Sequence, residues 1–339
     1  MRTLYQRTNT FDNTRRSILK YASGTVVAAA LPSFAFAQSY PEKPSKILLG
    51  YSAGGTADTM LRLVAQQLTI EFGQPFVVEN KPGASGNIAA TQVARSPADG
   101  YSLLLGNTAE MAVNSSFMKH TGFDVEKDFA PVALVYDVPL ALVVSAASPF
   151  KTLDDLIAAA KKPNSNITFA SAGQGSPGHL AGEELARSMN ASTSITHVPY
   201  KGAAPALVDV IAGHVTYYFS GVTAITQFVK SGQVRVLALS SQKRSRFMKD
   251  VPTIAELTGA DFSFTLWGGV FAPAKTDRLI IEALNKKIGT AMAQPNIKAA
   301  MEREGSDANP MSPDEFSAFV KSESERYRLL VENLGIKPE

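Results

Sequence analysis

The 339-residue sequence has no cysteine and only four histidines, which limits the chemistry that it can perform. Without cysteine there are no disulfides and no thiolate metal sites. The histidines lie far apart, with none of the i, i+4 spacing typical of zinc sites on helices: His120, His179, His197 and His214. Ser176 precedes His179 by three residues, but no G-x-S-x-G elbow surrounds it. We therefore expect no metal, no cofactor and no catalytic residue.

Long apolar runs are also missing, since no stretch reaches the roughly 20 residues that a bilayer span requires. Residues 1–37 instead have the order of a secretory signal: Arg15-Arg16-Ser17-Ile18-Leu19-Lys20, an apolar stretch from Tyr21 to Leu31, and Ala35-Phe36-Ala37. We expect export to the periplasm and cleavage near Ala37. The paired arginines favour the twin-arginine route, although ordinary secretory signals also carry paired basic residues. A short membrane anchor is the alternative interpretation.

Runs of basic residues are absent as well. The chain has 33 basic and 30 acidic residues and a pI near 8.9. The predicted signal holds five of the basic residues and one acid, which leaves 28 against 29. A mature charge near −1 argues against nucleic acid or an anionic membrane as the main partner. We expect a monomer.

About 300 residues remain after the signal, and 45% of the chain is hydrophobic, enough for two domains. Short apolar strand candidates alternate with helical patterns, which predicts an α/β fold with doubly wound parallel sheets. The strand candidates are Lys46 to Gly50, Phe76 to Asn80, Ser102 to Leu105, Val132 to Tyr136, Leu140 to Val144, Ile167 to Ala170, Ile195 to Val198, Val215 to Phe219 and Val234 to Leu239. The last 65 residues read as helices, from Thr276 to Ala293 and from Ser312 to about Asn333.

The domain boundary is predicted from two crossings. The chain leaves the first domain near residues 141–145 and returns near residues 237–241. This assigns residues 38–145 and 238–339 to lobe 1 and residues 146–237 to lobe 2. Two strands that cross between lobes form a hinge. We expect the single tryptophan, Trp267, to pack near this hinge rather than stack on a ligand.

A glycine-rich turn, Tyr51-Ser52-Ala53-Gly54-Gly55-Thr56-Ala57-Asp58, joins the first predicted strand to a helical pattern. Adjacent glycines let the backbone approach a ligand with no Cβ in the way. The first turn of a helix leaves N–H groups unpaired and carries partial positive charge. The turn therefore predicts a site for a carboxylate or a phosphate.

A second turn of the same type, Ser171-Ala172-Gly173-Gln174-Gly175-Ser176-Pro177-Gly178, lies in the other predicted lobe. Its glycines also satisfy G-x-G-x-x-G, but no acid follows the next strand near Val198, and Pro177 removes an N–H. Dinucleotide binding is thus a weak alternative, and a simple tight turn is a stronger one.

The chain resembles the substrate-binding proteins of tripartite tricarboxylate transporters, also called Bug-type periplasmic receptors, over nearly the whole mature sequence. The motifs that carry the resemblance are Tyr40-Pro41 with Pro44, Ala53-Gly54-Gly55-Thr56-Ala57-Asp58, Val78-Glu79-Asn80-Lys81-Pro82-Gly83-Ala84-Ser85-Gly86, Pro97-Ala98-Asp99-Gly100-Tyr101, Gly173-Gln174-Gly175-Ser176, Val198-Pro199-Tyr200-Lys201-Gly202 and Trp267-Gly268-Gly269-Val270-Phe271-Ala272-Pro273.

The resemblance implies a two-lobed type II periplasmic binding protein that closes on a small organic acid and performs no chemistry. It also implies a membrane transporter of one large and one small subunit as partner. The resemblance and the predicted turns together imply a set of ligand-binding residues in this chain. They are Tyr51, Ala53, Gly54, Gly55, Thr56, Asp58, Asn107, Thr108, Ser171, Ala172, Gly173, Ser176, Tyr200 and Lys201.

Several of these residues also have a purely structural interpretation. Asp58 can stabilise its own helix through the helix dipole. Tyr200 can be a core aromatic whose hydroxyl is hydrogen-bonded, and Lys201 can be a solvated surface residue. A sensory receptor and an exported hydrolase remain as alternative functions. The ligand stays open among organic acids, although the lack of an arginine clamp disfavours a tricarboxylate such as citrate.

Overall fold

The computed structural model describes residues 40–163, 165–190, 194–245, 248–303, 305–306 and 310–336. The predicted export signal and its cleavage site lie outside these residues. The strands are β1 (Ser45–Leu49), β2 (Phe76–Asn80), β3 (Ser102–Asn107), β4 (Phe129–Ser145), β5 (Ile167–Ser171), β6 (Ile195–Pro199), β7 (Tyr217–Gly221), β8 (Val234–Leu239) and β9 (Thr265–Pro273).

Helices fill most of the segments between these strands. They are α1 (Thr56–Phe72), η1 (Ala84–Gly86), α2 (Asn87–Ala94), η2 (Ala109–Val113), α3 (Asn114–Phe117), α4 (Val125–Asp128), α5 (Leu153–Ala160), α6 (Pro177–Ser188), α7 (Ala203–Ile211), α8 (Val222–Lys230), α9 (Ile254–Thr258), α10 (Arg278–Ala293), α11 (Pro295–Arg303) and α12 (Pro313–Asn333). Among the described residues, none of them combines the length and the apolar character needed to cross a bilayer.

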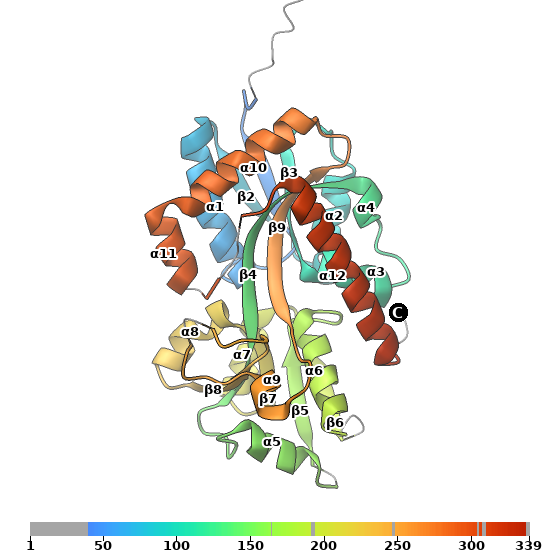
Figure 1. The fold of residues 1–339 in the computed structure, drawn as a ribbon, viewed down its shortest axis with the longest axis vertical. Coiled ribbons are helices and arrows are strands. Elements are labelled where there is room, and N and C mark those ends of the chain that lie inside the picture. The colour runs from blue at the N-terminus through green and yellow to red at the C-terminus, as the bar shows by residue number, and fades with distance from the viewer. Residues whose placement is uncertain are drawn as a thin grey trace, which may run out of the picture. The chain divides into compact units, whose positions relative to one another are not determined.

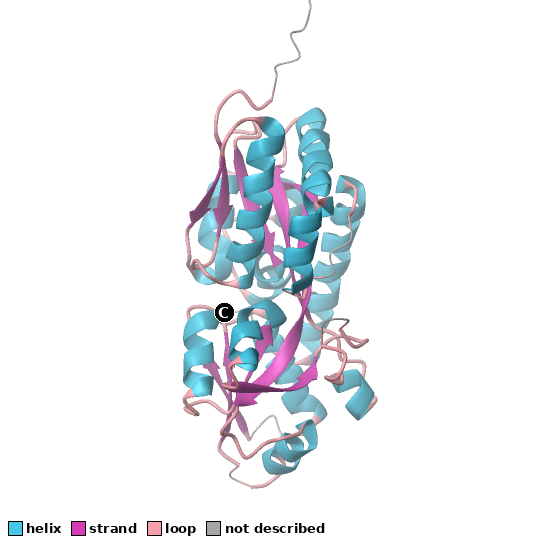
Figure 2. Cartoon of the chain, turned by 90° about the vertical axis from the view of Figure 1, so that its left-hand side faces the viewer, coloured by secondary structure: helices cyan, strands magenta, loops and turns pink. Residues whose placement is uncertain are grey.

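The strands follow the order β2-β1-β3-β9-β4-β7-β5-β6, and β8 also pairs with β4. Strand pairs toward both ends of this order are parallel: β1 pairs with β2 and β3, and β5 pairs with β6 and β7. The central strand β4 is antiparallel to β7, β8 and β9. The α/β architecture with helices on both faces is confirmed, and the sheet is mixed rather than wholly parallel (Figure 2).

Two long strands connect the halves of the molecule (Figure 1). Residues 132–136 and 140–144, predicted as separate strands, are one continuous strand, because Pro139 pairs with Thr265 on the partner strand and does not interrupt it. The prediction missed β9, whose Gly268 and Gly269 weaken the strand pattern. The two-strand connection itself is confirmed.

The return crossing lies later than the sequence suggests. After β8, the Phe264 N–H donates to the Ser240 carbonyl at 3.1 Å, and the Phe262 ring stacks on Phe219 at 5.9 Å. These contacts hold residues 262–264 beside β7 and the end of β8. We therefore propose that residues 238–264 belong to lobe 2 and that the chain returns at β9, near Thr265. The rest of the predicted lobe division stays a prediction.

Apolar side chains cover both faces of the sheet. On the lobe 1 side, α1, α10 and α11 pack over one face, and α2, η2 and α12 pack over the other. On the lobe 2 side, α7 and α8 pack over one face, and α5, α6 and α9 over the other. Trp267 is fully buried between β9 and α12, where its Nε1 donates to Glu323 at 3.0 Å and its ring contacts Phe319. This confirms its predicted packing role.

Candidate functional site

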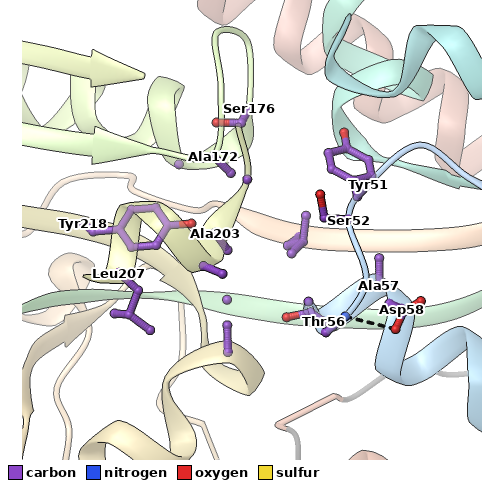
Figure 3. Close-up of a pocket in the computed structure, with 18 of the residues that line it drawn as sticks. Tyr51, Ser52, Thr56, Ala57, Asp58, Ala172, Ser176, Ala203, Leu207 and Tyr218 are labelled. Atoms are coloured by element: carbon purple, nitrogen blue, oxygen red, sulfur yellow. Dashed lines mark hydrogen bonds between the residues drawn. The ribbon is translucent and has the colours of Figure 1, made fainter. Parts of the chain in front are cut away.

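A cavity of about 320 Å³ lies between the turn that precedes α1 and the first turns of α6, α7 and α8. Figure 3 shows Tyr51, Thr56 and Asp58 on one side of it and Ala172, Ala203 and Leu207 on the other. Residues from β4 and β9, such as Tyr136, Leu140 and Leu266, complete the wall. The volume is within the range of small-molecule sites.

The structure brings most of the predicted site residues to this cavity. Its wall includes Tyr51, Ala53, Gly54, Gly55, Thr56, Asp58, Asn107, Ala172, Ser176 and Lys201. The four that do not reach the wall are Thr108, Ser171, Gly173 and Tyr200. Contact of the ten with a ligand remains a prediction.

The four residues away from the wall have structural partners. The Thr108 hydroxyl accepts from the Trp267 N–H at 2.9 Å, which joins β3 to β9. The Ser171 hydroxyl lies 2.7 Å from His197 Nε2 and donates to the carbonyl of Gly173 at 2.9 Å. The Tyr200 hydroxyl donates to Asp209 at 2.5 Å, and this bond, with the electrostatic repulsion of the carboxylate, adds to burial in raising the pKa of the tyrosine to about 12. They shape the turns behind the cavity.

Asp58 fixes the conformation of the first turn. It accepts from the Gly54 N–H at 3.1 Å and from the Asn80 side chain at 2.9 Å, and it pairs with Arg62 at 2.9 Å. Burial alone would raise the pKa of this carboxyl, but these hydrogen bonds hold the pKa below its ordinary value. Gly54 has φ +86°, a conformation that glycine adopts without strain. The Gly54 amide is therefore committed to Asp58 and is not available to a ligand in this conformation.

Three helices that begin at the cavity have a glycine N-cap with no side-chain hydrogen bond: Gly55 before α1, Gly202 before α7 and Gly221 before α8. By contrast, α5, α9 and α12 each begin with a capping box, on Thr152, Thr253 and Ser312. The helices at the cavity thus keep first-turn N–H groups and their partial positive charge without a capping side chain.

These helix ends approach one another across the cavity. A Cβ added at Gly221 would lie 3.1 Å from Thr56 Oγ1. The fourth helix, α6, differs because its N-cap Ser176 accepts from the His179 N–H at 3.3 Å. Positive helix ends from both lobes therefore converge on one small volume.

A buried polar network forms the floor of the cavity. The Asn107 N–H and side-chain amide donate to Glu110 Oε1 at 2.9 and 3.0 Å. The Tyr51 hydroxyl donates to Glu110 Oε2 at 2.8 Å, and the Tyr136 hydroxyl donates to Asn107 Oδ1. Tyr51, Asn107 and Tyr136 reach the cavity, whereas Glu110 lies behind them.

Charge on the wall is sparse. Among the described residues that line the cavity, the ionised side chains are Asp58, which is paired with Arg62, and Lys201, which is exposed. Apolar side chains such as Leu207, Phe228 and Leu266 cover much of the remainder. The site can hold an anion with an apolar body. No cluster of three metal-binding side chains occurs in the part of the chain described.

Sequence reasoning predicted Tyr200 and Lys201 in the turn after β6 but not the residues that follow them, and it missed the turn after β7 entirely. Residues 202–205 follow β6 and residues 221–224 follow β7, and both are strand-to-helix junctions with glycine, the signal that revealed the first two turns. Tyr136, Leu140 and Leu266 had no local signal, because only the pairing of β4 with β9 brings them to the cavity.

Comparison with known proteins agrees with this geometry. Residues 60–336 match the tripartite tricarboxylate transporter family receptor, TctC. The protein BugT of Bordetella pertussis is 35% identical over 92% of this chain and 95% of its own length. The solved structure of R. palustris Rpa4515 with adipate has a TM-score of 0.85 at 31% identity, over 88% of this chain and all of that one.

A second solved structure, MatC from Rhodopseudomonas palustris with bound malate, has a TM-score of 0.80 at 27% identity, over 86% of this chain and all of that one. The family and these neighbours are binding proteins. The chain belongs to the tripartite tricarboxylate transporter receptor family, a family of periplasmic solute-binding receptors.

Proposed function

We propose that this receptor captures a small organic acid in the cavity between its two lobes and delivers it to the large and small membrane subunits of a tripartite tricarboxylate transporter. It performs no chemistry on the acid. The site contacts are those predicted residues that line the cavity, with the turns before α7 and α8 added.

The convergence of three uncapped helix N-termini carries this proposal. Each helix end contributes about 0.3 to 1 kcal/mol to holding an anion, or about 2 kcal/mol when partly buried. Hydrogen bonds from first-turn amides to a charged group add about 1.5 to 3 kcal/mol each. Together these support micromolar binding, about −8 kcal/mol.

The composition of the wall favours a short acid with an apolar body over a highly charged one. Lys201 is the one ionised lining residue, among those described, for which no ion pair is present. It can neutralise one carboxylate, and the helix ends can hold another. The adipate of Rpa4515 and the malate of MatC, both dicarboxylates, are therefore the first acids to test.

A thermal-shift screen of the purified protein tests the proposal. The panel contains adipate, malate, citrate, acidic amino acids and aromatic acids, with neutral sugars as controls. A ligand at about 100 times its dissociation constant should stabilise the fold by about 2.7 kcal/mol, which is several degrees for a protein of this size. A shift with dicarboxylates supports the proposal. Shifts with sugars alone, or no shift with any acid, would contradict it.

A further inference from the structure

Glu110 is a buried carboxylate beside the cavity. The proposed ligand contacts do not include it. The residue is 1% exposed and lies in η2, directly after β3. Its neighbourhood leaves no room for a side chain at Gly86, where an added Cβ would lie 2.6 Å from the Glu110 carboxyl. A carboxyl enclosed in this way has an environment fixed by its protein partners.

The groups around Glu110 are hydrogen-bond donors rather than cations. Asn107 donates twice to Oε1, and Tyr51 donates to Oε2. Burial raises the pKa of Glu110, and the hydrogen bonds from Asn107 and Tyr51 lower it. Burial has the larger effect, and the resulting pKa is about 7. The carboxyl therefore gains and loses its proton near neutral pH.

The other titratable groups near Glu110 come from the elements around η2. The loop after β1 supplies Tyr51 and β4 supplies Tyr136, both phenols whose pKa is raised by burial and by Glu110 itself. On α12, the Ser324 hydroxyl donates to the Met111 carbonyl at 3.3 Å, and Glu323 is paired with Arg326 at 2.8 Å. Neither η1 nor α3 contains a charged residue. No described lysine or arginine is paired with Glu110.

The same network reaches the opposite lobe. The Tyr51 hydroxyl lies 3.3 Å from the Ser85 carbonyl, in addition to its bond with Glu110. The Ser85 hydroxyl in turn donates to the Gln174 carbonyl at 3.1 Å, across the gap between the lobes. Tyr51 is thus placed between the buried carboxyl and an interlobe hydrogen bond.

We propose that Glu110 is a proton-binding positioning residue that couples protonation of the cavity floor to closure of the lobes on an anionic ligand. The coupling to ligand binding rests on the proposed function, whereas the proton site on Glu110 does not. When Glu110 is ionised, the Tyr51 proton is directed to Oε2. When Glu110 takes a proton from solvent at Oε2, it donates to the Tyr51 oxygen instead.

The Tyr51 hydroxyl is then free to donate to the Ser85 carbonyl. This hydrogen bond fixes the position of Ser85, the residue whose own hydroxyl donates to the opposite lobe. Protonation also removes a negative charge from behind the cavity. Both effects favour binding of an anion, and an anion in the cavity in turn raises the pKa of Glu110. Binding is therefore accompanied by proton uptake.

The proton site is tested first without ligand. In protein labelled with ¹³C-glutamate, the Glu110 carboxyl signal is identified by its loss in Glu110→Gln, and its titration is followed from pH 4 to 9. We expect a midpoint near 7, moved upward in Tyr51→Phe, because that variant removes a hydrogen bond that favours the carboxylate. A midpoint near the ordinary value of about 4.3 overturns the proposal.

The coupling is tested by calorimetry with adipate and malate at pH 6.5 to 9, in buffers of different ionisation enthalpy. If binding raises the pKa of Glu110 by one unit, affinity at pH 6.5 exceeds that at pH 9 by about sevenfold. Glu110→Gln should abolish both the pH dependence and the proton uptake, whereas Glu126→Gln, which removes an exposed carboxylate on α4, should change neither.

The outcomes separate the two proposals. A neutral midpoint with no effect of pH on binding overturns the coupling. A neutral midpoint with no acid bound at any pH leaves the proton site supported and contradicts the proposed function instead.

Discussion

Two adjacent glycines in the turn before α1 have different roles. Gly54 has φ +86° and gives its N–H to Asp58, so any side chain there disturbs the turn itself. Gly55 has an extended backbone, φ −85° and ψ 175°, and an added Cβ meets nothing closer than 4.0 Å. A substitution at Gly55 therefore tests the cavity without straining the fold.

We expect Gly55→Val to weaken binding of the acid by at least about tenfold, or about 1.4 kcal/mol, because the branched side chain stands between the ligand and the first-turn amides. The melting temperature without ligand should stay close to that of the wild type. Gly289→Val, on α10 and also without close neighbours, is the control. Unchanged affinity in Gly55→Val would remove the α1 turn from the site.

Asp58 is expected to act through stability. Asp58→Ala leaves the Gly54 amide and the Asn80 side chain without their acceptor, so the free energy of unfolding should fall by about 2 kcal/mol or more. Asp154→Asn, which alters an exposed first-turn acid of α5, should have little effect. Urea denaturation measures both.

Because the pKa of Asp58 is lowered in the folded protein, its contribution to the free energy of unfolding depends on pH. Its stabilisation is complete above the unfolded-state value near 3.8 and is lost as the pH falls through the lower folded-state value. The difference between wild type and Asp58→Asn should therefore shrink in strong acid. A difference that grows on acidification would mean that the carboxylate is not what stabilises the turn.

At the scale of elements, β9 shows why a strand can carry glycines. An added Cβ at Gly268 would lie 2.4 Å from the Tyr136 ring, and one at Gly269 would lie 2.2 Å from Phe316 and 2.7 Å from the Ala133 carbonyl. The glycines let aromatic side chains from β4 and α12 press against the strand. The residues that hide β9 from a strand pattern are thus the ones that its packing requires.

Gly269→Ala should therefore destabilise the protein by about 1 to 3 kcal/mol, the cost of overpacking a core in which a backbone carbonyl cannot move aside. Gly289→Ala, in an open position on a helix, should stabilise it by up to about 1 kcal/mol. Equal effects of the two substitutions in urea denaturation would contradict this account of β9.

At the scale of the whole molecule, the two lobes touch where Ser85 meets the turn after β5. An added Cβ at Gly173 would lie 3.5 Å from Ser85 Oγ. The chain has no cysteine of its own, so Ser85→Cys with Gly173→Cys gives a single possible disulfide. Its loop of roughly ninety residues should stabilise by about 4.6 kcal/mol, which exceeds the about 1 to 3 kcal/mol of strain at φ +142°.

We expect the oxidised double variant to exchange a bound acid far more slowly than the wild type, and reduction to restore exchange, because the link holds the lobes together. Exchange of labelled adipate or malate, whichever binds in the thermal-shift screen, measures this. Ser85→Cys alone is the control. Equal exchange rates in oxidised and reduced protein would show that the lobes need not separate.

The local sequence determined those features that depend on neighbouring residues: the short parallel strands, the N-caps of α5 and α12, and the glycine turns before α1 and α6. The family motifs and the predicted turns together indicated the fold and ten of the residues that line the cavity. These features were predictable because strand patterns, caps and turns are set by residues a few positions apart.

Only the tertiary structure decided which turns share a cavity and what lies behind them. Tyr136 and Leu266 reach the wall because residues 129–139 of β4 pair with β9, and Glu110 is buried because β3, η2 and the turn before α1 meet there. Contacts between segments far apart in the sequence leave no periodic signal in either segment. The glycine turns at the cavity could therefore be predicted from the sequence, and the buried carboxylate behind them could not.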